Sequence, residues 1–386
     1  MEKKAKRRNQ RDGHNKLNPL KLAVVVGARP NFIKIAPLYW EFKKHPGIKP
    51  ILVHTGQHYD FGMSQVFFRD LNIPEPNYNL GIGSGTHAVQ TAQAMIELEK
   101  VFIKENPDWV VVVGDVNSTL AAAIVAAKLH LKIAHIEAGP RMFNKVMPEE
   151  INRVLTDHLA DLNFCPTKSS VKNLKSEGIG RSAYFTGDTM YDAFLNLLKT
   201  AKKREKQILA EFSLAPKEYI LLTMHRPANV DDPEKLYAIM EAIIKVGKRV
   251  IFPVHPRTKK QMAAIADRLG KLENFGNIKF IDPVGYTEIV VLEKNAKKIL
   301  TDSGGVQKEA YWLEVPCITM LESQGWPEIH EDGWNLLVGN DPKKIYLGIL
   351  KFDPKKPSKK HFGNGDAAKK MTNLILLAPE HLGRDT

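Results

Sequence analysis

The sequence contains few cysteines and no long apolar run, and each shortage excludes a class of protein. Its 386 residues include two cysteines, Cys165 and Cys317, which lie far apart in the chain. A disulfide scaffold and a cysteine-built metal site are therefore excluded. Because both cysteines lie in apolar, strand-like segments, we expect buried free thiols. No segment approaches the ~18 consecutive apolar residues that a membrane-spanning helix needs.

The N-terminal segment lacks the apolar core of a signal peptide. Residues 1–20 contain seven basic and two acidic residues, and no such apolar core follows them. We expect residues 1–19 to form a basic, disordered tail, and the protein to be cytoplasmic. The chain has a net charge of +13. Because the basic residues of the tail are not interleaved with aromatic ones and no nucleic-acid-binding motif is present, nucleic acid is not expected as a partner. A membrane is not expected either, since the chain has no apolar span.

What is present is an ordinary globular composition, with 43% hydrophobic and 26% charged residues, over a length that suggests two domains. Short apolar runs alternate with segments of helical periodicity, which predicts parallel βαβ units. The expected strands are 21–27, 51–54, 109–113 and 133–136, then 219–223, 250–254, 278–280, 298–301 and 317–320. We therefore expect an α/β protein with two Rossmann-like, doubly wound parallel sheets, in domains 20–190 and 191–366. A C-terminal helix within 367–386 could pack back on the first domain.

Charged residues follow the predicted strands of the first domain. Ligands of open α/β sheets bind beyond the carboxyl ends of the strands. Arg29 and Lys34 follow the first strand, Asp115 follows strand 109–113, and Glu137 follows strand 133–136. Acids mixed with cations indicate proton chemistry beside an anionic ligand. The alternative for Asp115 is a cap on the helix that opens near residue 117.

A helix start at 147–153 adds further charged residues. Pro148 is followed by Glu149 and Glu150, acids that helix capping alone would explain. Arg153 lies four residues after Glu149, so we expect it to hold that carboxylate ionised.

The second domain shows a similar pattern. His225 and His255 follow strands, although His255 precedes a proline and could be structural. Ser303-Gly304-Gly305 opens a helix, where small residues let backbone N–H groups approach a phosphate. Glu309 lies one turn into that helix and suits a ribose diol. Because the dinucleotide and Walker A loops are absent, neither NAD nor ATP is indicated.

Eleven segments together resemble the non-hydrolysing UDP-N-acetylglucosamine 2-epimerases, in order from Gly27 to about Ala368. They are GARPNFIKIAPL, TGQHYD, GDVNSTLAAA, HIEAG, MPEEINRVLTDHLADL, TGDTMYDA, MHRPANVDD, VHPR, TDSGGVQKEA, WPE and FGNGDA. The resemblance implies a GT-B-like fold with the nucleotide sugar in the cleft between two domains. It also implies a reaction in which the C2 proton is removed as UDP leaves C1, giving a 2-acetamidoglucal to which UDP adds back. It implies no metal and no cofactor, a homodimer, and a role in polysaccharide biosynthesis.

The resemblance also implies roles for individual residues. The catalytic residues would be Asp115, Glu137, Glu149 and His225. The UDP-sugar would be bound by Arg29, Lys34, Arg153, Ser303, Gly304, Gly305 and Glu309. Gln57, His58 and His255 match parts of the site at which bacterial members bind a second UDP-N-acetylglucosamine as activator.

The segment 321–328 departs from the family pattern. Members usually carry arginine at the position of Leu321 and often glutamate at that of Gly325, and some relatives have arginine where this chain has Trp326. An epimerase of a modified UDP-HexNAc, such as a 2,3-diacetamido uronate, therefore stays open. So do a GT-B glycosyltransferase and a nucleotide-sugar-binding regulatory protein without activity.

Overall fold

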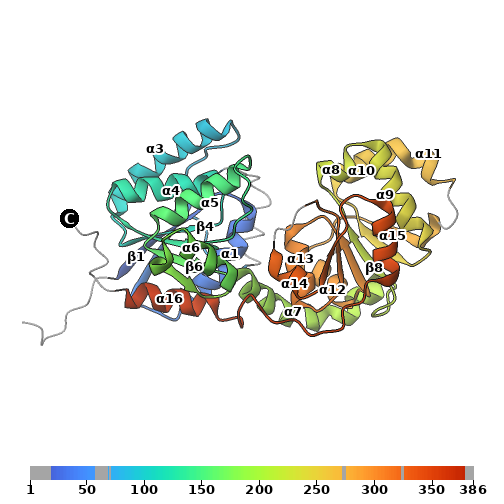
Figure 1. Ribbon diagram of the computed structural model, residues 1–386. Helices are drawn as coiled ribbons and strands as arrows, with labels where there is room; N and C mark the ends of the chain where they lie inside the picture. Colours follow the sequence, from blue (N-terminus) through green and yellow to red (C-terminus); the bar gives the residue numbers. More distant parts are fainter. Residues whose placement is uncertain (1–18, 57–67, 69–70, 272–274, 323–325, 379–386) are drawn as a thin grey trace, which may run out of the picture. The chain divides into compact units, whose positions relative to one another are not determined.

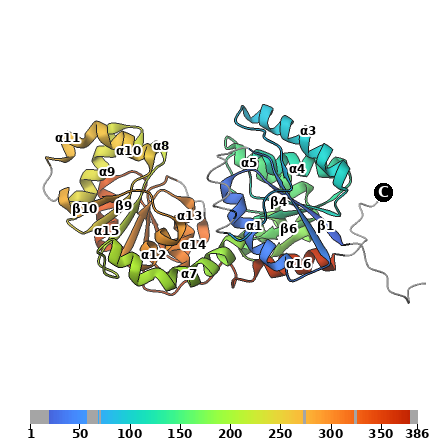
Figure 2. The same ribbon diagram turned by 180° about the vertical axis from the view of Figure 1, so that it is seen from behind.

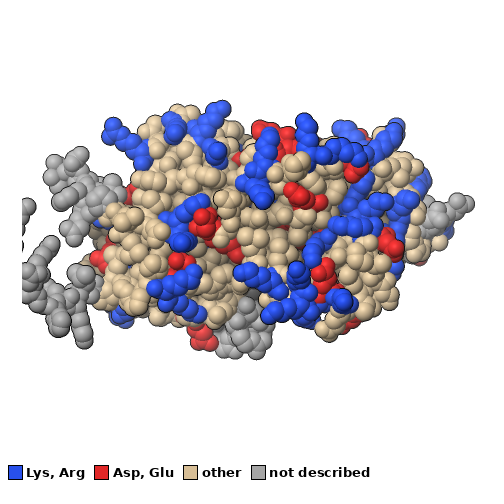
Figure 3. Space-filling view, turned by 90° about the horizontal axis from the view of Figure 1, so that it is seen from below, with Lys and Arg blue, Asp and Glu red and all other residues tan. Residues whose placement is uncertain are grey.

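The computed structural model describes residues 19–56, 68, 71–271, 275–322 and 326–378. It divides into two compact units, Met1–Thr189 with Asp366–Thr386, and Met190–Gly365 (Figure 1). The predicted basic tail lies outside the described residues. Figure 3 shows Lys and Arg side chains distributed over much of one face, with Asp and Glu side chains among them.

The first unit is built on a seven-stranded parallel sheet of order β3-β2-β1-β4-β5-β6-β7. Its strands are β1 (Leu20–Val26), β2 (Ile48–His54), β3 (Tyr78–Asn79), β4 (Trp109–Val113), β5 (Lys132–Ile136), β6 (Leu162–Cys165) and β7 (Ala183–Phe185). Its helices are α1 (Arg29–Phe42), α3 (His87–Glu105), α4 (Asn117–Lys128), α5 (Pro148–Leu159), α6 (Lys168–Ser176) and α16 (Ala367–Leu377), with a short 3-10 turn at Gly180–Ser182. The central strands are apolar on both sides, as in β4 with the sequence WVVVV, because helices cover both faces of the sheet.

The last helix of the chain belongs to the first unit. α1 and α16 pack on one face of the sheet, while α3 and α4 pack on the other (Figures 1 and 2). Met371 and Ile375 of α16 share a buried cluster with Ile35 of α1 and Leu22 of β1. The C-terminal segment therefore contributes to the core that supports the first sheet.

The second unit repeats the architecture with a six-stranded parallel sheet of order β10-β9-β8-β11-β12-β13. Its strands are β8 (Ile220–Thr223), β9 (Val250–Pro253), β10 (Ile278–Ile281), β11 (Lys298–Thr301), β12 (Cys317–Thr319) and β13 (Asn335–Leu337). Its helices are α7 (Thr189–Glu211), α8 (Pro227–Val230), α9 (Pro233–Lys245), α10 (Pro256–Met262), α11 (Ala266–Leu269), α12 (Tyr286–Asn295), α13 (Gly304–Trp312), α14 (Pro327–Glu331) and α15 (Pro342–Lys351), with 3-10 turns at Ala263–Ile265 and Phe275–Asn277. α9 and α15 cover one face, and α7, α12 and α13 cover the other.

The predicted fold class is confirmed, since both sheets are parallel and doubly wound. Both cysteines are free and buried as expected. Burial raises the pKa of both thiols, that of Cys317 to about 12. Within the described ranges, no helix is both long and apolar enough to cross a membrane.

Candidate active site

The loop after β1 is held in place by Asn31. Its Oδ1 accepts hydrogen bonds from the backbone N–H groups of Gly27 (3.1 Å) and Ala28 (3.0 Å). Its Nδ2 donates to the carbonyl of Val113 at the end of β4 (3.4 Å). This buried side chain thus ties together the carboxyl ends of two neighbouring strands and fixes the start of α1, the helix that carries Lys34.

Lys34 and Glu137 form an ion pair with 2.8 Å between Nζ and Oε2, and their side chains are 11% and 14% exposed. Gly114 leaves room for the ammonium, because a Cβ at that position would lie 3.2 Å from Nζ. Burial by itself lowers the pKa of Lys34, but the charges of Glu137 and Asp115 outweigh it and the pKa is raised. Lys34 is therefore a charged group beside two of the predicted acid/base residues.

Arg153 connects Asp115 to α5. One guanidinium nitrogen pairs with Asp115 Oδ2, and the other donates to Glu150 Oε2 at 2.6 Å. Burial lowers the pKa of Arg153, yet the nearby carboxylates, led by Asp115, raise it overall. The pairing of Arg153 with Glu149 that we predicted is wrong, because Glu150 turns into the fold while Glu149 is exposed.

The two acids at the start of α5 therefore differ in their surroundings. Glu150 is buried, and its carboxylate accepts hydrogen bonds from the backbone N–H groups of Met142 (3.0 and 3.1 Å) and Phe143 (2.9 Å). It holds the loop that precedes the helix. Glu149 is exposed, and no described residue engages its carboxylate in a hydrogen bond or ion pair.

In the second unit, Asp302 organises the ends of β8 and β11. It is fully buried, and its carboxylate accepts from the backbone N–H groups of His225 (3.0 and 3.1 Å) and Arg226 (2.9 Å) and from Asn229 Nδ2 (3.0 Å). The His225 ring lies 3.3 Å from the same carboxylate and is 43% exposed. Burial lowers the pKa of His225, the charge of Asp302 opposes this, and His255 and Arg226 lower it further.

Ser303, Gly304 and Gly305 form the start of α13, as predicted. The Ser303 hydroxyl accepts from the Val306 N–H, and a Cβ on Gly304 would meet nothing within 4 Å. Glu309 lies one turn further on and is 5% exposed. The N-terminal turn of α13 is thus open enough to receive an anion.

The Glu309 carboxylate lies in a buried acidic pair. Tyr286 donates its hydroxyl proton to Glu309 Oε1 at 2.5 Å. Burial raises the pKa of both Glu309 and Glu293, and the charge of Glu309 raises that of Glu293 further. Two buried carboxyl groups so close together disfavour being ionised at the same time, and Tyr286 is the group that bonds Glu309.

Of the remaining predicted residues, the structure describes His255 in full and Arg29 only in its backbone. His255 is exposed, and its Nδ1 accepts the Arg257 N–H (3.2 Å), so it caps α10. Its ring lies 5.5 Å from that of His225. Arg29 begins α1, and its side chain lies outside the described structure. Gln57 and His58 also lie outside the described residues.

Sequence reasoning missed the supporting groups Glu150, Asp302 and Glu293. Glu150 and Asp302 stand inside motifs that were identified, but sequence alone does not show that their carboxylates are buried. Among the described residues, no group of three or more His, Cys, Asp or Glu side chains is arranged to hold a metal ion.

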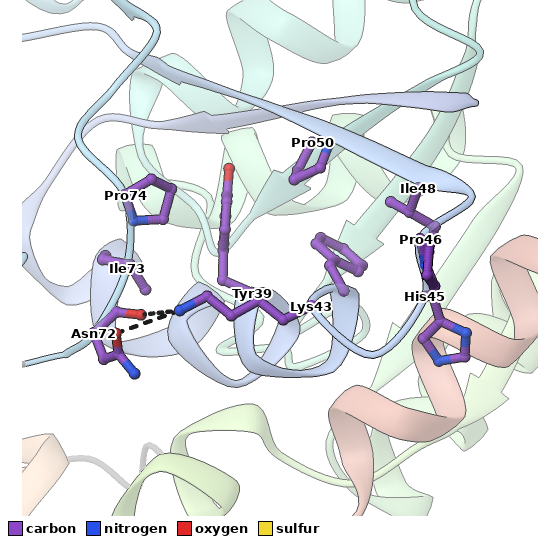
Figure 4. Close-up of a pocket in the computed structure, with 10 residues that line it drawn as sticks. Tyr39, Lys43, His45, Pro46, Ile48, Pro50, Asn72, Ile73 and Pro74 are labelled. Atoms are coloured by element: carbon purple, nitrogen blue, oxygen red, sulfur yellow. Dashed lines mark hydrogen bonds between the residues drawn. The ribbon is translucent and has the colours of Figure 1, made fainter. Parts of the chain in front are cut away.

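The first unit also has a pocket of about 470 Å³ at the opposite, amino-terminal end of the sheet. Figure 4 shows its lining from α1, from the start of β2 and from residues 72–74. Tyr39 stands in it with a buried hydroxyl that no described residue bonds, and Lys43 donates to Asn72. Its walls are mainly apolar and lack the paired acids and cations found at the carboxyl end.

Two parallel α/β units, with acids, cations and a small-residue helix start at the carboxyl ends of their strands, define a GT-B-like enzyme. The sequence profile described as UDP-N-acetylglucosamine 2-epimerase matches residues 40–376. The chain belongs to this family and is a 2-epimerase of UDP-sugars.

Three relatives illustrate the similarity. A UDP-N-acetylglucosamine 2-epimerase homolog of Methanococcus maripaludis is 49% identical, covering 92% of this chain and 99% of the relative. The UDP-2,3-diacetamido-2,3-dideoxy-D-glucuronate 2-epimerase of Pseudomonas aeruginosa is 44% identical over 83% of this chain and 88% of the relative. The crystal structure of Methanocaldococcus jannaschii UDP-GlcNAc 2-epimerase in complex with UDP-GlcNAc and UDP matches with a TM-score of 0.80 and 45% identity, over 92% and 99% of the two chains. These matches favour an epimerase over the glycosyltransferase and the inactive regulatory protein.

Proposed function

We propose that this enzyme is a non-hydrolysing epimerase that interconverts UDP-N-acetylglucosamine and UDP-N-acetylmannosamine. The observation that carries the proposal is the pair of acid–cation contacts at the carboxyl end of the first sheet, Glu137 with Lys34 and Asp115 with Arg153. Glu149 adds a third carboxylate, exposed at the start of α5. The substrate is supported by the solved Methanocaldococcus structure, in which a 45% identical chain holds UDP-GlcNAc and UDP.

The chemistry requires more than one proton carrier. The hydrogen on sugar C2 is a weak acid with no adjacent carbonyl to stabilise a carbanion, so the departure of UDP must supply much of the driving force. A positively charged ring develops as the C1–O bond breaks, and carboxylates stabilise it. Inversion at C2 needs one group to remove the proton and another to return it on the opposite face. We assign these roles to Asp115, Glu137 and Glu149.

UDP binding is assigned to the second unit, with Arg29 and Lys34 as contributors from the first. The N-terminal turn of α13 at Ser303–Gly305 would bind phosphate through backbone N–H groups. His225 would contact the diphosphate, and Glu309 would accept hydrogen bonds from the ribose hydroxyls.

A second candidate substrate is a UDP-2,3-diacetamido uronate. It is favoured by the 44% identity to the Pseudomonas aeruginosa enzyme, close to that of the relatives named for UDP-N-acetylglucosamine. Leu321 and Trp326 stand where members of the family often carry arginine. The loss of these cations is the kind of change that would accommodate a different sugar.

Proton NMR in D₂O tests the proposal directly. The purified protein is incubated with each of the two UDP-sugars, without metal or acceptor. We expect UDP-N-acetylmannosamine carrying deuterium at C2. Accumulation of free UDP and N-acetylmannosamine would instead identify a hydrolysing enzyme. Turnover of the uronate alone would replace the first substrate with the second.

We also propose that the enzyme is a homodimer formed through α3 and α5. These helices expose Ile96 (56%), Ile103 (65%), Ile151 (47%) and Leu155 (46%). Large exposed apolar side chains of this kind mark an interaction surface where they form one patch. A groove beside them is lined in part by Ala88, Met95 and Ile151, a shape that an apolar helix of a second copy would fill.

A further inference from the structure

The loops that carry Asp115 and Glu137 have backbone conformations that need support. Gly114 has a φ of +70°, Glu137 of +68° and Gly139 of +86°. This left-handed region is disfavoured for a residue with a Cβ, such as Glu137. A hydrogen bond from the Gly114 N–H to the Ile136 carbonyl (3.0 Å) joins the two loops directly.

His135 makes a second connection. It lies on β5 and is fully buried. Its Nε2 is 2.8 Å from the carbonyl oxygen of Gly114, and its Nδ1 is 2.7 Å from Asp157 Oδ1. Because a carbonyl oxygen only accepts hydrogen bonds, Nε2 must carry the proton of that contact. The imidazole therefore bridges α5 and the turn that leads into Asp115.

Asp157 extends the bridge to the second loop. Its Oδ2 accepts from the Gly139 N–H (3.1 Å) and pairs with Arg141 (2.7 Å), and the side chain is fully buried. Arg141 in turn binds Glu177 through two hydrogen bonds of 2.7 Å each. One carboxylate of α5 thus holds the turn before Asp115, through His135, and the turn after Glu137 directly.

We propose that His135 and Asp157 are positioning residues that set the separation of the Asp115 and Glu137 carboxylates for proton transfer. The proposal rests on the function proposed above. Both side chains are buried and act through the Gly114 carbonyl and the Gly139 N–H. Proton transfer on two faces of one carbon tolerates little displacement, since a misplacement of about 1 Å can lower the rate ~100-fold.

The first test replaces the bridging ring by one of similar size that makes no hydrogen bond. We expect His135→Phe to lower kcat about 100-fold while the dissociation constant of UDP, measured by calorimetry, stays within threefold. The matched control is Asn163→Ala. Asn163 is also fully buried and donates to the Asp157 backbone carbonyl (2.9 Å) rather than to its carboxylate. A folded His135→Phe protein with kcat within threefold of wild type would overturn the proposal.

The second test asks whether Asp157 acts through its hydrogen bonds or through its negative charge. It also replaces the first test if His135→Phe does not fold. With the His135 proton on Nε2 alone, an asparagine at 157 can donate to His135 Nδ1 through Nδ2 and accept from Gly139 and Arg141 through Oδ1. The contacts among residues 135, 139, 141 and 157 then survive without the negative charge. We expect Asp157→Asn to retain kcat within tenfold and Asp157→Ala to lose about 100-fold. Equal, large losses in two folded variants would contradict a positioning role.

A measurement that does not depend on enzyme activity shows whether the positioning proposal or the proposed function has failed. If the wild-type protein epimerises neither UDP-sugar, the proposed function fails. Hydrogen exchange at the Gly114 and Gly139 amides still tests the network. We expect faster exchange at both amides in Asp157→Ala than in Asp157→Asn, and wild-type rates at Gly114 in Asn163→Ala. Unchanged exchange in Asp157→Ala would show that the carboxylate does not hold these loops.

Discussion

Replacing Asp115 by asparagine tests whether this residue transfers a proton or only helps to bind the substrate. Asparagine keeps the shape of the side chain and can still accept a hydrogen bond from Arg153, but it cannot take up a proton at physiological pH. We expect Asp115→Asn to lower kcat at least 1000-fold, within the range general acid–base catalysis contributes, and to leave UDP affinity within a few fold. The control is Glu211→Gln, at an exposed carboxylate of α7. Surviving turnover in Asp115→Asn would move the acid/base role to the other carboxylates.

His225 provides a pH-dependent signal from the second unit. Burial places its pKa below the ordinary value of 6.5, and the neighbouring His255 lowers it further. The ring is therefore mainly neutral at pH 7. Because its folded pKa lies below the unfolded one, its contribution to stability is present above pH 6.5 and is lost as pH falls through the folded pKa.

Replacing His255 should shift this titration in a defined direction. His255 lowers the pKa of His225, so we expect His255→Asn to raise that pKa, while asparagine keeps the cap on α10. The measurement is the pH dependence of the ring Cε1–H signals by NMR. A downward shift, or none, would show that the two rings do not interact in solution.

At the scale of elements, the turn from β5 toward α5 is intolerant of side chains. A Cβ on Gly139 would lie 2.6 Å from the backbone oxygen of Ser170, whereas a Cβ on Gly178, which shares the left-handed conformation, meets nothing within 4 Å. We expect Gly178→Ala to cost about 1 kcal/mol of unfolding free energy from its conformation alone. Gly139→Ala should cost about 1–3 kcal/mol more, because backbone must move to relieve the overlap. Urea unfolding of both variants measures the difference, and equal costs would contradict the predicted overlap.

The helix α16 stabilises a sheet whose strands lie far upstream in the chain. Met371 is fully buried against the cluster that includes Ile35, whereas Leu377, on the same helix, is 77% exposed. We expect Met371→Ala to lower the unfolding free energy by about 2–4 kcal/mol and Leu377→Ala to change it by less than about 0.5 kcal/mol. Thermal unfolding followed by circular dichroism would reveal the difference. A similar effect of both variants would mean that α16 does not pack on the first sheet in solution.

The elements that sequence predicts well are those with long apolar runs. β4 begins and ends where its WVVVV run does, and the polar residues after β1, β4 and β5 were located because strand ends are readable from the chain. The short strands β3, β7 and β13 were missed, and β6 was anticipated only as a strand-like segment around Cys165, because two to four residues carry too little pattern.

The contacts within the site were less predictable. Helical spacing allowed Arg153 to pair with Glu149, but the buried partner is Glu150, because tertiary packing decides which side of α5 faces inward. The buried carboxyl pair of Glu293 and Glu309 joins two helices, and no local pattern in the sequence indicates such a contact.

At the scale of the whole molecule, the exposed apolar surface of the first unit is the feature that a single chain leaves unexplained. Besides the side chains on α3 and α5, Phe143 is 79% exposed and Val146 is 88% exposed in the loop before α5. Burying such a surface against a second copy would contribute favourable free energy at about 25 cal/mol per Å². The same surface lies beside α5, whose inner face carries Arg153 and Asp157, so association would also stabilise the helix that organises the acids.

The oligomeric state follows as a measurable consequence. Light scattering on the purified protein should give twice the chain mass of 43.4 kDa. We expect Ile151→Glu/Leu155→Glu to give a monomer, because two charges would be buried without partners at the interface. The matched control is Leu347→Glu/Leu350→Glu, which introduces the same charges at apolar positions of α15 with similar exposure, 46% and 42%, and should remain dimeric. A monomeric wild-type protein would show that there is no dimer contact, and a dimer that survives the α5 substitutions would place the contact elsewhere. In either case the exposed apolar residues of α3 and α5 would need another partner.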